Sequence, residues 1–496
     1  MNASRHLNLY GGSLALLTDL YQLTMSYGYW QQGRKDDEAI FHMFFRKTPF
    51  EGGYALAAGL GTFVEYLEGF HFSESDLEYL ATLEGNDGKP LFHKDYLQFL
   101  EEMELRCDID ALPEGTPVFP QAPMVRVRGP LIQCQLLETA LLTILNFQTL
   151  IATKSARICE AAEGGEVLEF GLRRAQGPDG GISAARAAII GGAEATSNVL
   201  AGKLLGLPVK GTHAHSWVMS FDSELEAFES YAQAMPNNAV FLVDTFDTLE
   251  GVKKAVTVGK NLRERGHEML GIRLDSGDLA YLSIEARKIL DKGGFRDAKI
   301  VASNNLDEYT IESLHRQGAK IDIWGVGTNL ATGGDQPALG GVYKLGAIKK
   351  PGQPWKPSLK LSEQRAKISN PGCLQVRRFY SKNYALGDMI FNELHGKPVD
   401  GIIVDPLDDL RRKEIDLENS TTRDLLQPIY REGTLVDEEI LHTPLTEIRE
   451  RARGELSRLH QTIRRFTNPH EYPIGLSQSL NRERRTLVLQ ARNIEE

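Results

Sequence analysis

The chain has 496 residues, of which 42% are hydrophobic and 25% charged, a composition typical of globular proteins with two or three domains. Its net charge of −11 argues against a nucleic-acid or anionic-membrane partner, because either would favour a basic surface. Cysteines 107, 134, 159 and 373 include no Cys-x-x-Cys pair, which argues against a zinc knuckle or disulfide framework and favours a reducing cytoplasm.

Residues 1–130 are expected to form an N-terminal α/β segment. LLTDLYQLTMSYGYW (16–30) predicts a helix, and Asp19 interrupts its apolar run, so it makes a poor signal peptide. DEAIFHMFFRK (37–47) predicts an extended segment, and SESDLEYLATL (73–83) begins with Ser and acids, as a capped helix does. TPVFPQAPMVRVRGPL (116–131) alternates and carries prolines, which predicts edge strands. No run approaches the ~18 apolar residues that span a bilayer.

Residues 131–345 are expected to form the catalytic domain, opening with a long amphipathic helix over 135–162. Short apolar runs then alternate with helical sequence. These runs are EVLEF (166–170), LPVKG (207–211), AVFLVDT (239–245), EMLGIRLDS (268–276), AKIVASNN (298–305) and IDIWGVGT (321–328). The alternation indicates βαβ units and a parallel sheet, and the number of units favours a barrel over an open sheet.

Each of these runs ends in polar or glycine-rich residues. A barrel enzyme builds its active site from the loops at the C-terminal ends of its strands. The ends in question are 171–174, 212–216, 244–247, 275–278, 303–305 and 325–328. We therefore expect a site at this edge of the sheet. Further strands are expected at 373–381, 388–394 and 400–406, followed by a helix over 446–466 whose basic residues form a solvated face.

GTHAHS (211–216) places two histidines two positions apart. In an extended segment such residues point to the same side, so His213 and His215 would jointly face a site. No later strand end carries a histidine, since His267 precedes its run and His315 lies in helical sequence. The pair therefore falls short of the three protein ligands of a catalytic zinc site. A metal-binding, a general-base or nucleophilic, and a purely structural histidine all stay open at this point.

The other strand ends carry groups suited to phosphates and hydroxyls. GVGTN (325–329) offers unobstructed backbone N–H groups that can cradle a phosphate. In RLDSGD, Arg273 and Asp275 form an anion clamp beside a hydroxyl or magnesium binder, while Asp278 either joins them or caps the next helix. In VDTFDT, Asp244 is likewise a candidate hydroxyl or magnesium binder, and Asp247 is expected to cap the next helix.

EFGLRR supplies an aromatic ring, Phe170, and two guanidiniums, Arg173 and Arg174. The ring either stacks on a ligand or packs in the core, and the guanidiniums suit an anion. Together, these ends suit a phosphorylated sugar with a planar partner.

Eight motifs in order resemble the nicotinate phosphoribosyltransferase family. They are TDLYQLTM (18–25), EFGLRRAQGPDG (169–180), TSNVLAG (196–202), GTHAHSW (211–217), VDTFDT (243–248), RLDSGDL (273–279), SNNLDE (303–308) and GVGTNLATGGDQPALGGVYKL (325–345). The resemblance runs from about residue 16 to 345 and continues weakly through PGCLQVRRF (371–379). It implies an incomplete α/β barrel of the type II phosphoribosyltransferase kind. Beside it, the N-terminal segment and residues 346–496 would form a second α/β domain, usually in a homodimer.

The resemblance also implies the reaction. Such an enzyme joins nicotinate to 5-phosphoribosyl-1-diphosphate and releases nicotinate mononucleotide and diphosphate, in NAD biosynthesis and salvage. It uses Mg²⁺, and it couples ATP hydrolysis to the reaction through a phosphohistidine. Carried over by position, the phosphorylated residue is His215, and His213 is a bystander.

The remaining roles follow from the same motifs. The resemblance implies that Asp275 binds the ribose hydroxyls and acts with His215 in catalysis, and Asp244 is the candidate metal ligand. The implied substrate-binding residues are Tyr21 and Phe170 on the ring, Arg273 on its carboxylate, Arg173 on phosphate groups, Thr212 beside the histidine, and Gly327 and Thr328 on the 5-phosphate. Ser197 stands where the related nicotinamide enzymes place an aspartate, which would repel a carboxylate.

Three alternatives remain beside this interpretation. A nicotinamide phosphoribosyltransferase shares the fold, and Ser197 argues against it. A barrel metal-dependent hydrolase would use His213 and His215. A non-catalytic phosphosugar-binding protein would bind the sugar diphosphate without consuming ATP.

Overall fold

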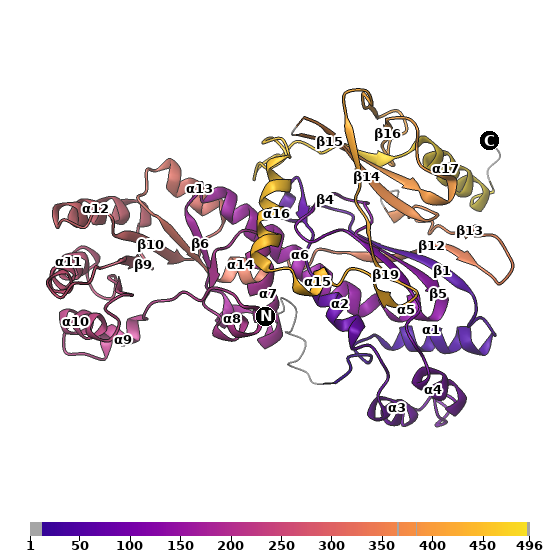
Figure 1. Cartoon of the computed structure of the whole chain (residues 1–496), viewed down its shortest axis with the longest axis horizontal. Coiled ribbons are helices and arrows are strands. Elements are labelled where there is room, and N and C mark those ends of the chain that lie inside the picture. Colours follow the sequence, from indigo (N-terminus) through magenta and orange to yellow (C-terminus); the bar gives the residue numbers. More distant parts are fainter. Residues whose placement is uncertain (1–11, 365–366, 383, 494–496) are drawn as a thin grey trace. The chain divides into compact units, whose positions relative to one another are not determined.

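The computed structural model describes residues 12–364, 367–382 and 384–493, and within them the chain divides into two compact units. The terminal unit combines residues 1–153 with 338–496, and the central unit spans Lys154–Pro337. Figure 1 shows how the indigo N-terminal strands and the orange strands near residue 350 share one sheet. In the described residues, no helix is both long and apolar enough to cross a membrane.

The terminal unit is built on mixed and antiparallel sheets. Its helices are α1 (Leu20–Gln31), α2 (Leu60–Glu68), α3 (Glu74–Ala81), α4 (Lys94–Glu101), α5 (Leu131–Leu136), the first part of α6 (Glu138–Ala161), α15 (Glu439–His442), α16 (Leu445–Ser457) and α17 (Gln478–Ala491). Its strands are β1 (Glu38–Phe44), β2 (Ala55–Leu56), β3 (Asp108–Ala111), β4 (Pro117–Val118), β5 (Val125–Pro130), β12 (Val342–Lys349), β13 (Lys356–Pro357), β14 (Leu374–Ser381), β15 (Tyr384–Asn392), β16 (Ile402–Val404), β17 (Arg412–Glu414), β18 (Thr421–Asp424), β19 (Gln427–Arg431), β20 (Thr434–Leu435) and β21 (Ile474–Leu476). The capped helix predicted from 73–83 is confirmed, because Ser73 and Asp76 form a capping box on α3.

The sheet orders of this unit join distant segments. One sheet runs β13-β12-β1-β5-β3-β19-β20 and another β17-β16-β21-β15-β14-β18, while β2 pairs with β4. The expectation of edge strands over 116–131 is wrong for β5, which lies between β1 and β3. Pro120 and Pro123 precede β5 and Pro130 is its last residue, so residues 125–129 keep the N–H groups that a central position needs.

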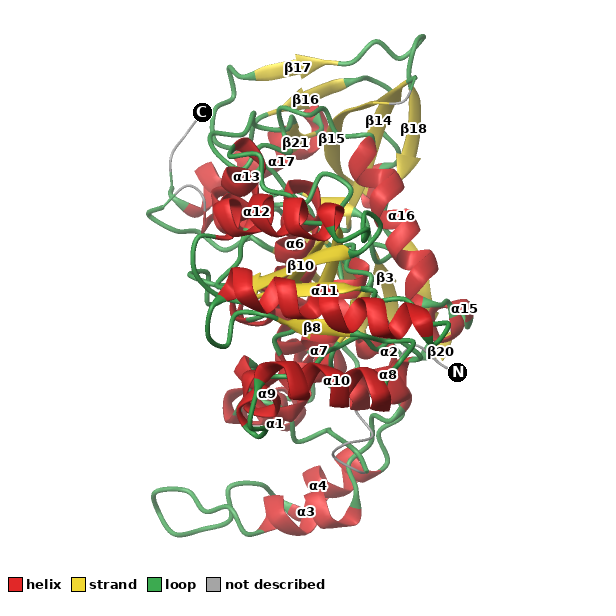
Figure 2. Cartoon of the chain, turned by 90° about the vertical axis from the view of Figure 1, so that its left-hand side faces the viewer, coloured by secondary structure: helices red, strands yellow, loops and turns green. Residues whose placement is uncertain are grey.

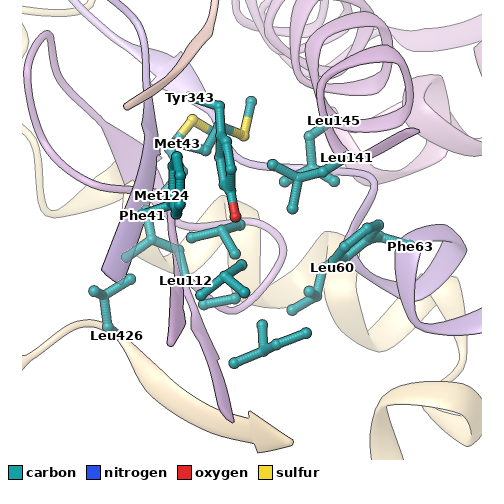
Figure 3. Packing of buried hydrophobic residues seen from close by; sticks show 14 of the residues in the cluster. Phe41, Met43, Leu60, Phe63, Leu112, Met124, Leu141, Leu145, Tyr343 and Leu426 are labelled. Carbon is teal, nitrogen blue, oxygen red and sulfur yellow. The ribbon is translucent and has the colours of Figure 1, made fainter. Parts of the chain in front are cut away.

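The core of the terminal unit depends on this pairing of early and late strands. Phe41 of β1 stacks on Tyr343 of β12, with ring centroids 4.8 Å apart. Figure 3 shows the two rings facing each other, with Met43 and Met124 beside them and Leu141 of α6 opposite. Because these side chains come from both ends of the chain, the terminal unit cannot form its core from either segment alone.

The central unit alternates strands with helices, as predicted. Its strands are β6 (Glu166–Glu169), β7 (Ala195–Thr196), β8 (Val240–Leu242), β9 (Gly271–Leu274), β10 (Lys299–Asn304) and β11 (Ile323–Val326). Its helices are α7 (Gly177–Ile190), α8 (Val199–Leu205), α9 (His215–Met219), α10 (Glu224–Ala234), α11 (Thr248–Glu264), α12 (Leu279–Lys292), α13 (Glu308–Arg316) and α14 (Thr328–Thr332), with a 3₁₀ turn, η3 (Leu172–Arg174). Figure 2 shows α10, α11 and α12 lying one beside the next across one face of β8 and β10.

The strands pair in parallel in the order β7-β6-β11-β10-β9-β8, which confirms the parallel sheet. The sheet is open, so the barrel is not confirmed: in the described residues β7 and β8 do not pair with each other. The run LPVKG (207–211), expected as a strand, makes only a single bridge from Val209 to Thr196. Pro208 lacks the N–H that a continued ladder would use. The short strand β7 was not predicted.

Local signals start the helices after these strands. Asp247 accepts a hydrogen bond from the Glu250 N–H at the start of α11, which confirms the predicted cap. Asp278 accepts a hydrogen bond from the Tyr281 N–H at the start of α12. Of its two predicted roles, the structure therefore shows the helix cap. The strand ends therefore lead directly into helices, and their polar residues stay at one edge of the sheet.

Candidate active site

The C-terminal ends of the central strands surround a cavity of about 490 Å³. The residues predicted from the sequence that line it include Phe170, Arg173, Arg174, Ser197, Thr212, His213, His215, Arg273, Asp275, Gly327 and Thr328. Asp244 joins them through a hydrogen bond from the Asp275 N–H to its Oδ2 (2.8 Å). These groups come from different strand ends, which meet because all the strands run in the same direction.

One wall of the cavity is the ring of Phe170, which directly follows β6. Its backbone N–H donates to the Val326 carbonyl (2.8 Å). At Gly325, a Cβ would lie 2.8 Å from the Phe170 ring, so only glycine leaves room for the ring there. At Gly171, a Cβ would lie 2.3 Å from the Ala331 Cβ. These glycines allow the aromatic wall to lie close against the loop that begins α14.

Arg273 and Asp275 are linked by Ser303 into a closed ring of hydrogen bonds. Arg273 Nε donates to Ser303 Oγ (2.8 Å), Ser303 Oγ donates to Asp275 Oδ1, and Arg273 Nη2 also donates to Asp275 Oδ1 (3.0 Å). Arg273 Nη1 donates to Thr212 Oγ1 (3.2 Å) and to the His213 carbonyl (3.4 Å). The guanidinium is therefore held in place before any ligand binds, 5.9 Å from the centre of the Phe170 ring.

The same ring of hydrogen bonds keeps Asp275 ionised. Burial would raise the pKa of Asp275, but the Ser303 hydrogen bond and the Arg273 charge outweigh it, so its pKa is lowered. Asp275 Oδ2 faces His215, 3.8 Å from Nε2. An ionised carboxylate at this position can accept from sugar hydroxyls or join a cation.

His215 is oriented by Thr245, a residue to which the sequence interpretation gave no role. His215 Nδ1 lies 3.1 Å from Thr245 Oγ1. Its Nε2 faces two carboxylates, at 3.9 Å from Asp244 Oδ1 and 3.8 Å from Asp275 Oδ2. The hydrogen bond at Nδ1 sets the ring so that Nε2 is the nitrogen directed at the carboxylates. Thr245 lies inside VDTFDT, and only its motif membership could have suggested it.

His213 and His215 both line the cavity, but their rings bind different partners, so they do not act as the pair that the sequence interpretation considered. The chain is not extended through both, because α9 begins at His215. His213 is buried against Tyr231, with ring centroids 4.7 Å apart, and its Nε2 accepts from the Leu242 N–H (3.3 Å). Burial lowers the pKa of His213 to about 4, so this ring is neutral. These contacts are those of a packed, hydrogen-bonded side chain, and in the described residues no cluster suited to a metal ion includes the two histidines.

Asp244 is the best-placed candidate for holding a cation. Its side chain is 1% exposed, and Oδ2 accepts from Asp275 N–H and from Ser276 Oγ (2.6 Å). Its Oδ1 is buried and has no hydrogen-bond partner in the described part of the chain. Clusters of three or more His, Cys, Asp or Glu side chains suited to a metal ion are absent from the described residues. Asp244 and Asp275 fit Mg²⁺, which binds through one or two carboxylates plus water and substrate phosphates.

The remaining predicted residues lie at the rim or outside this unit. Ser197 and Thr212 are half-buried, while Arg173 and Thr328 are exposed. Gly327 lies immediately before α14. Tyr21 lies in the terminal unit near the start of α1, is 48% exposed and is not among the residues that line this cavity.

Comparison with known proteins identifies related sequences along almost the whole chain. A family described as the nicotinate phosphoribosyltransferase (NAPRTase) N-terminal domain matches residues 16–146, the NAPRTase family matches 166–353, and the C-terminal domain matches 374–484. The chain is 44% identical to the nicotinate phosphoribosyltransferase of Bacillus subtilis, over 94% of this chain and 93% of the relative. It is 38% identical to that of Caenorhabditis elegans, over 96% and 93%.

Solved structures agree with these matches. The chain resembles human nicotinic acid phosphoribosyltransferase with a TM-score of 0.81 at 33% identity, covering 95% of this chain and 99% of the human one. A nicotinate-nucleotide pyrophosphorylase from Pyrococcus furiosus is similar in fold, with a TM-score of 0.67 at 20% identity over 92% and 97% of the two chains.

Proposed function

Since the chain belongs to the nicotinate phosphoribosyltransferase family, we propose that it makes nicotinate mononucleotide and diphosphate from nicotinate and 5-phosphoribosyl-1-diphosphate. This is a step of NAD biosynthesis and salvage. The observation that carries the proposal is the cavity at the strand ends, which combines an aromatic wall, a fixed guanidinium and two carboxylates. We also propose that the central unit belongs to the incomplete barrels of the type II phosphoribosyltransferase kind.

The residues around the cavity suit each part of the two substrates. The ring of Phe170 stacks on the pyridine, and Arg273 attracts its carboxylate. Nearly all N–H groups of Arg273 are occupied, so we propose that it acts through its charge and one remaining Nη2 N–H. Asp275 binds the ribose hydroxyls, Arg173 the diphosphate, and Gly327 with Thr328 the 5-phosphate. Thr212 stays beside the substrates while it holds Arg273.

The chemical step needs stabilisation of charge more than covalent help. As diphosphate leaves C1 of the ribose, that carbon gains oxocarbenium character and the leaving oxygens gain negative charge. Mg²⁺, when bound by Asp244 and Asp275, supplies positive charge to those oxygens. Arg173 and Arg273 hold the substrates, while Phe170 excludes water from one face of the ring.

We further propose that ATP phosphorylates His215 at Nε2. In that step Nε2 attacks the γ-phosphorus, an N–P bond forms, and the bond between the phosphorus and the departing ADP oxygen breaks. Thr245 holds the opposite nitrogen, and the charge of Asp244 stabilises the cationic ring. The phosphate adds about −1.5 to −2 charges beside the cation site, which tightens Mg²⁺ and the sugar diphosphate.

A homodimer in the cytoplasm completes the proposal. Tyr21 and Met25 lie one turn apart on α1, Leu20 begins that helix and Leu17 precedes it, and each of the four is more than a third exposed. An exposed apolar stripe of this kind is typical of a surface that a second copy covers. We propose that the partner subunit's site receives Tyr21 as its ring-stacking residue.

Nucleotide formation from the sugar diphosphate tests the proposal, with nicotinate and nicotinamide compared, with and without ATP. We expect nicotinate alone to be used. We also expect His215→Ala to keep slow turnover but lose the ATP stimulation, whereas His213→Gln keeps it. A preference for nicotinamide would overturn the interpretation of Ser197. An unchanged response to ATP in His215→Ala would exclude His215 as the phosphorylated residue.

A further inference from the structure

Glu169 is a fully buried carboxylate that no step above uses. It is the last residue of β6, immediately before Phe170, and it is 0% exposed. A carboxylate is almost never fully buried unless its oxygens have partners. The question is what this one holds in place.

Its side chain joins two separate segments of the cavity wall. One oxygen, Oε1, accepts from the Gly171 N–H, and the other, Oε2, accepts from Thr196 Oγ1, each at 2.5 Å. Thr196 Oγ1 also accepts from the Asn198 N–H (3.0 Å). Asn198 Oδ1 in turn accepts from the Ala201 N–H (3.1 Å) and caps α8. A continuous series of hydrogen bonds therefore runs from β6 into the start of α8.

The backbone of Glu169 reaches the same segment. Its carbonyl accepts from the Ser197 N–H (2.9 Å). Ser197 is therefore linked to Glu169 in two ways. Its N–H donates to the Glu169 carbonyl, and its neighbour Thr196 donates to the Glu169 side chain. Phe170 lies between Glu169 and Gly171, both of which belong to the same hydrogen-bonded group. Both Phe170 and Ser197 line the cavity.

The ladder between the two segments is too short to fix them by itself. β7 consists of Ala195–Thr196 at the edge of the sheet, and it pairs with β6 only through Leu168 and Glu169. Thr196 exchanges backbone hydrogen bonds with Pro208 and Lys210 on its other side, but these lead away from β6. Because two residue pairs are a weak ladder, the side-chain bridge of Glu169 adds to the link that positions Ser197 relative to Phe170.

We propose that Glu169 is a positioning residue for base selection, which sets the distance between the Phe170 ring and Ser197 so that the site accepts nicotinate. This inference rests on the proposed function. Glu169 makes no contact with the substrate, and its effect on selection comes from hydrogen-bond geometry rather than from its charge.

The variant Glu169→Gln separates the effect of hydrogen-bond geometry from the effect of the negative charge. In Glu169→Gln, the new side-chain carbonyl oxygen can accept from the Gly171 N–H, and the new amide can donate to Thr196 Oγ1, which keeps an unused acceptor site. Burial raises the pKa of Glu169 against the opposing hydrogen bonds of Thr196 and Gly171, so a neutral side chain is less costly here than in water. The bridge therefore survives in Glu169→Gln and is lost in Glu169→Ala.

The experiment measures kcat and KM for nicotinate, nicotinamide and the sugar diphosphate, together with thermal unfolding. We expect Glu169→Ala to raise the KM for nicotinate about tenfold and to reduce the preference for nicotinate over nicotinamide about tenfold, as the loss of buried hydrogen bonds implies. The KM for the sugar diphosphate stays close to that of the wild type. Glu169→Gln keeps both the KM for nicotinate and the preference.

Thr196→Val removes the other end of the bridge, so we expect it to change the KM for nicotinate and the substrate preference as Glu169→Ala does. This second variant keeps the test valid if Glu169→Ala does not fold. The matched control is Glu166→Ala, at the opposite end of the same strand, where the half-exposed Glu166 side chain pairs with Lys210 at the surface. We expect this control to behave as the wild type.

Three results would overturn the inference: wild-type preference in a folded Glu169→Ala, wild-type preference in Thr196→Val, or loss of preference in Glu169→Gln equal to that in Glu169→Ala. Failure of the wild-type enzyme to use nicotinate would instead refute the proposed function, before any variant is compared.

Discussion

Asp244→Asn is the substitution that best tests the proposed role of the carboxylate beside His215. Asparagine has nearly the same shape, and its carbonyl oxygen can still accept from Asp275 N–H and Ser276 Oγ. The change therefore removes one negative charge with little disturbance of the loop. The lost charge is that of Oδ1, which lies 3.9 Å from His215 Nε2.

The magnitude follows from that distance. Two unit charges about 4 Å apart interact by ~4 kcal/mol at an effective dielectric constant of ~20 and by ~1 kcal/mol in water. The side chain of His215 is 38% exposed, which moves the interaction toward the lower value. We therefore expect a loss of ~1–2 kcal/mol in stabilisation of the cationic ring, which corresponds to roughly 5- to 30-fold in the rate of phosphorylation.

The assay is transfer of labelled γ-phosphate from ATP to the protein, followed in parallel with nucleotide formation over a range of Mg²⁺ concentrations. We expect slower labelling and a higher Mg²⁺ requirement in Asp244→Asn. Asp247→Asn is the matched control in the same motif, since Asn caps a helix as well as Asp does. Labelling of Asp244→Asn at the wild-type rate, with an unchanged Mg²⁺ requirement, would refute the reasoning.

Three further changes test other parts of the site. Ser197→Asp should lower the ratio of kcat/KM for nicotinate over nicotinamide at least about tenfold, because the new carboxylate repels the acid; an unchanged ratio would exclude Ser197 from selection. Gly171→Ala should lower the Tm and raise the KM for nicotinate, because its Cβ would lie 2.3 Å from the Ala331 Cβ and 2.7 Å from the Gly327 carbonyl oxygen; a variant with wild-type values of both would contradict this packing. Burial lowers the pKa of His213 from 6.5 to about 4, so the unfolded chain takes up the proton first and the free energy of unfolding falls as the pH drops from 6.5 toward 4. Urea unfolding of His213→Gln at pH 7 and pH 5 should show a smaller fall than the wild type, and an equal fall would place the titration elsewhere.

Local patterns were enough to predict most elements of the central unit, though not β7, and the edge at which its site lies. The alternation of apolar runs with helical sequence predicts parallel strands, because only a helical crossover returns the chain in the same direction. Asp247 caps its helix through contacts within a few residues, which a sequence pattern can reveal. The polar strand ends meet for the same reason. Arg273 and Asp275 could be paired from the sequence because they lie two positions apart at the end of one strand.

Only the tertiary structure decided how these elements combine. Whether β5 lies at an edge or in the centre of its sheet depends on β1 and β3, to which it is hydrogen-bonded across the sheet, and its own prolines suggested the wrong answer. The different environments of His213 and His215 depend on where α9 begins and on which partner each ring binds.

The bridge from Glu169 to Thr196 joins residues 27 positions apart, and neither side chain signals the other in the sequence. Periodicity and capping act over a few residues, so they determine elements and the ends of those elements. Hydrogen bonds between distant segments determine which side chains face the cavity and at what distance, and these exist only once the chain has folded.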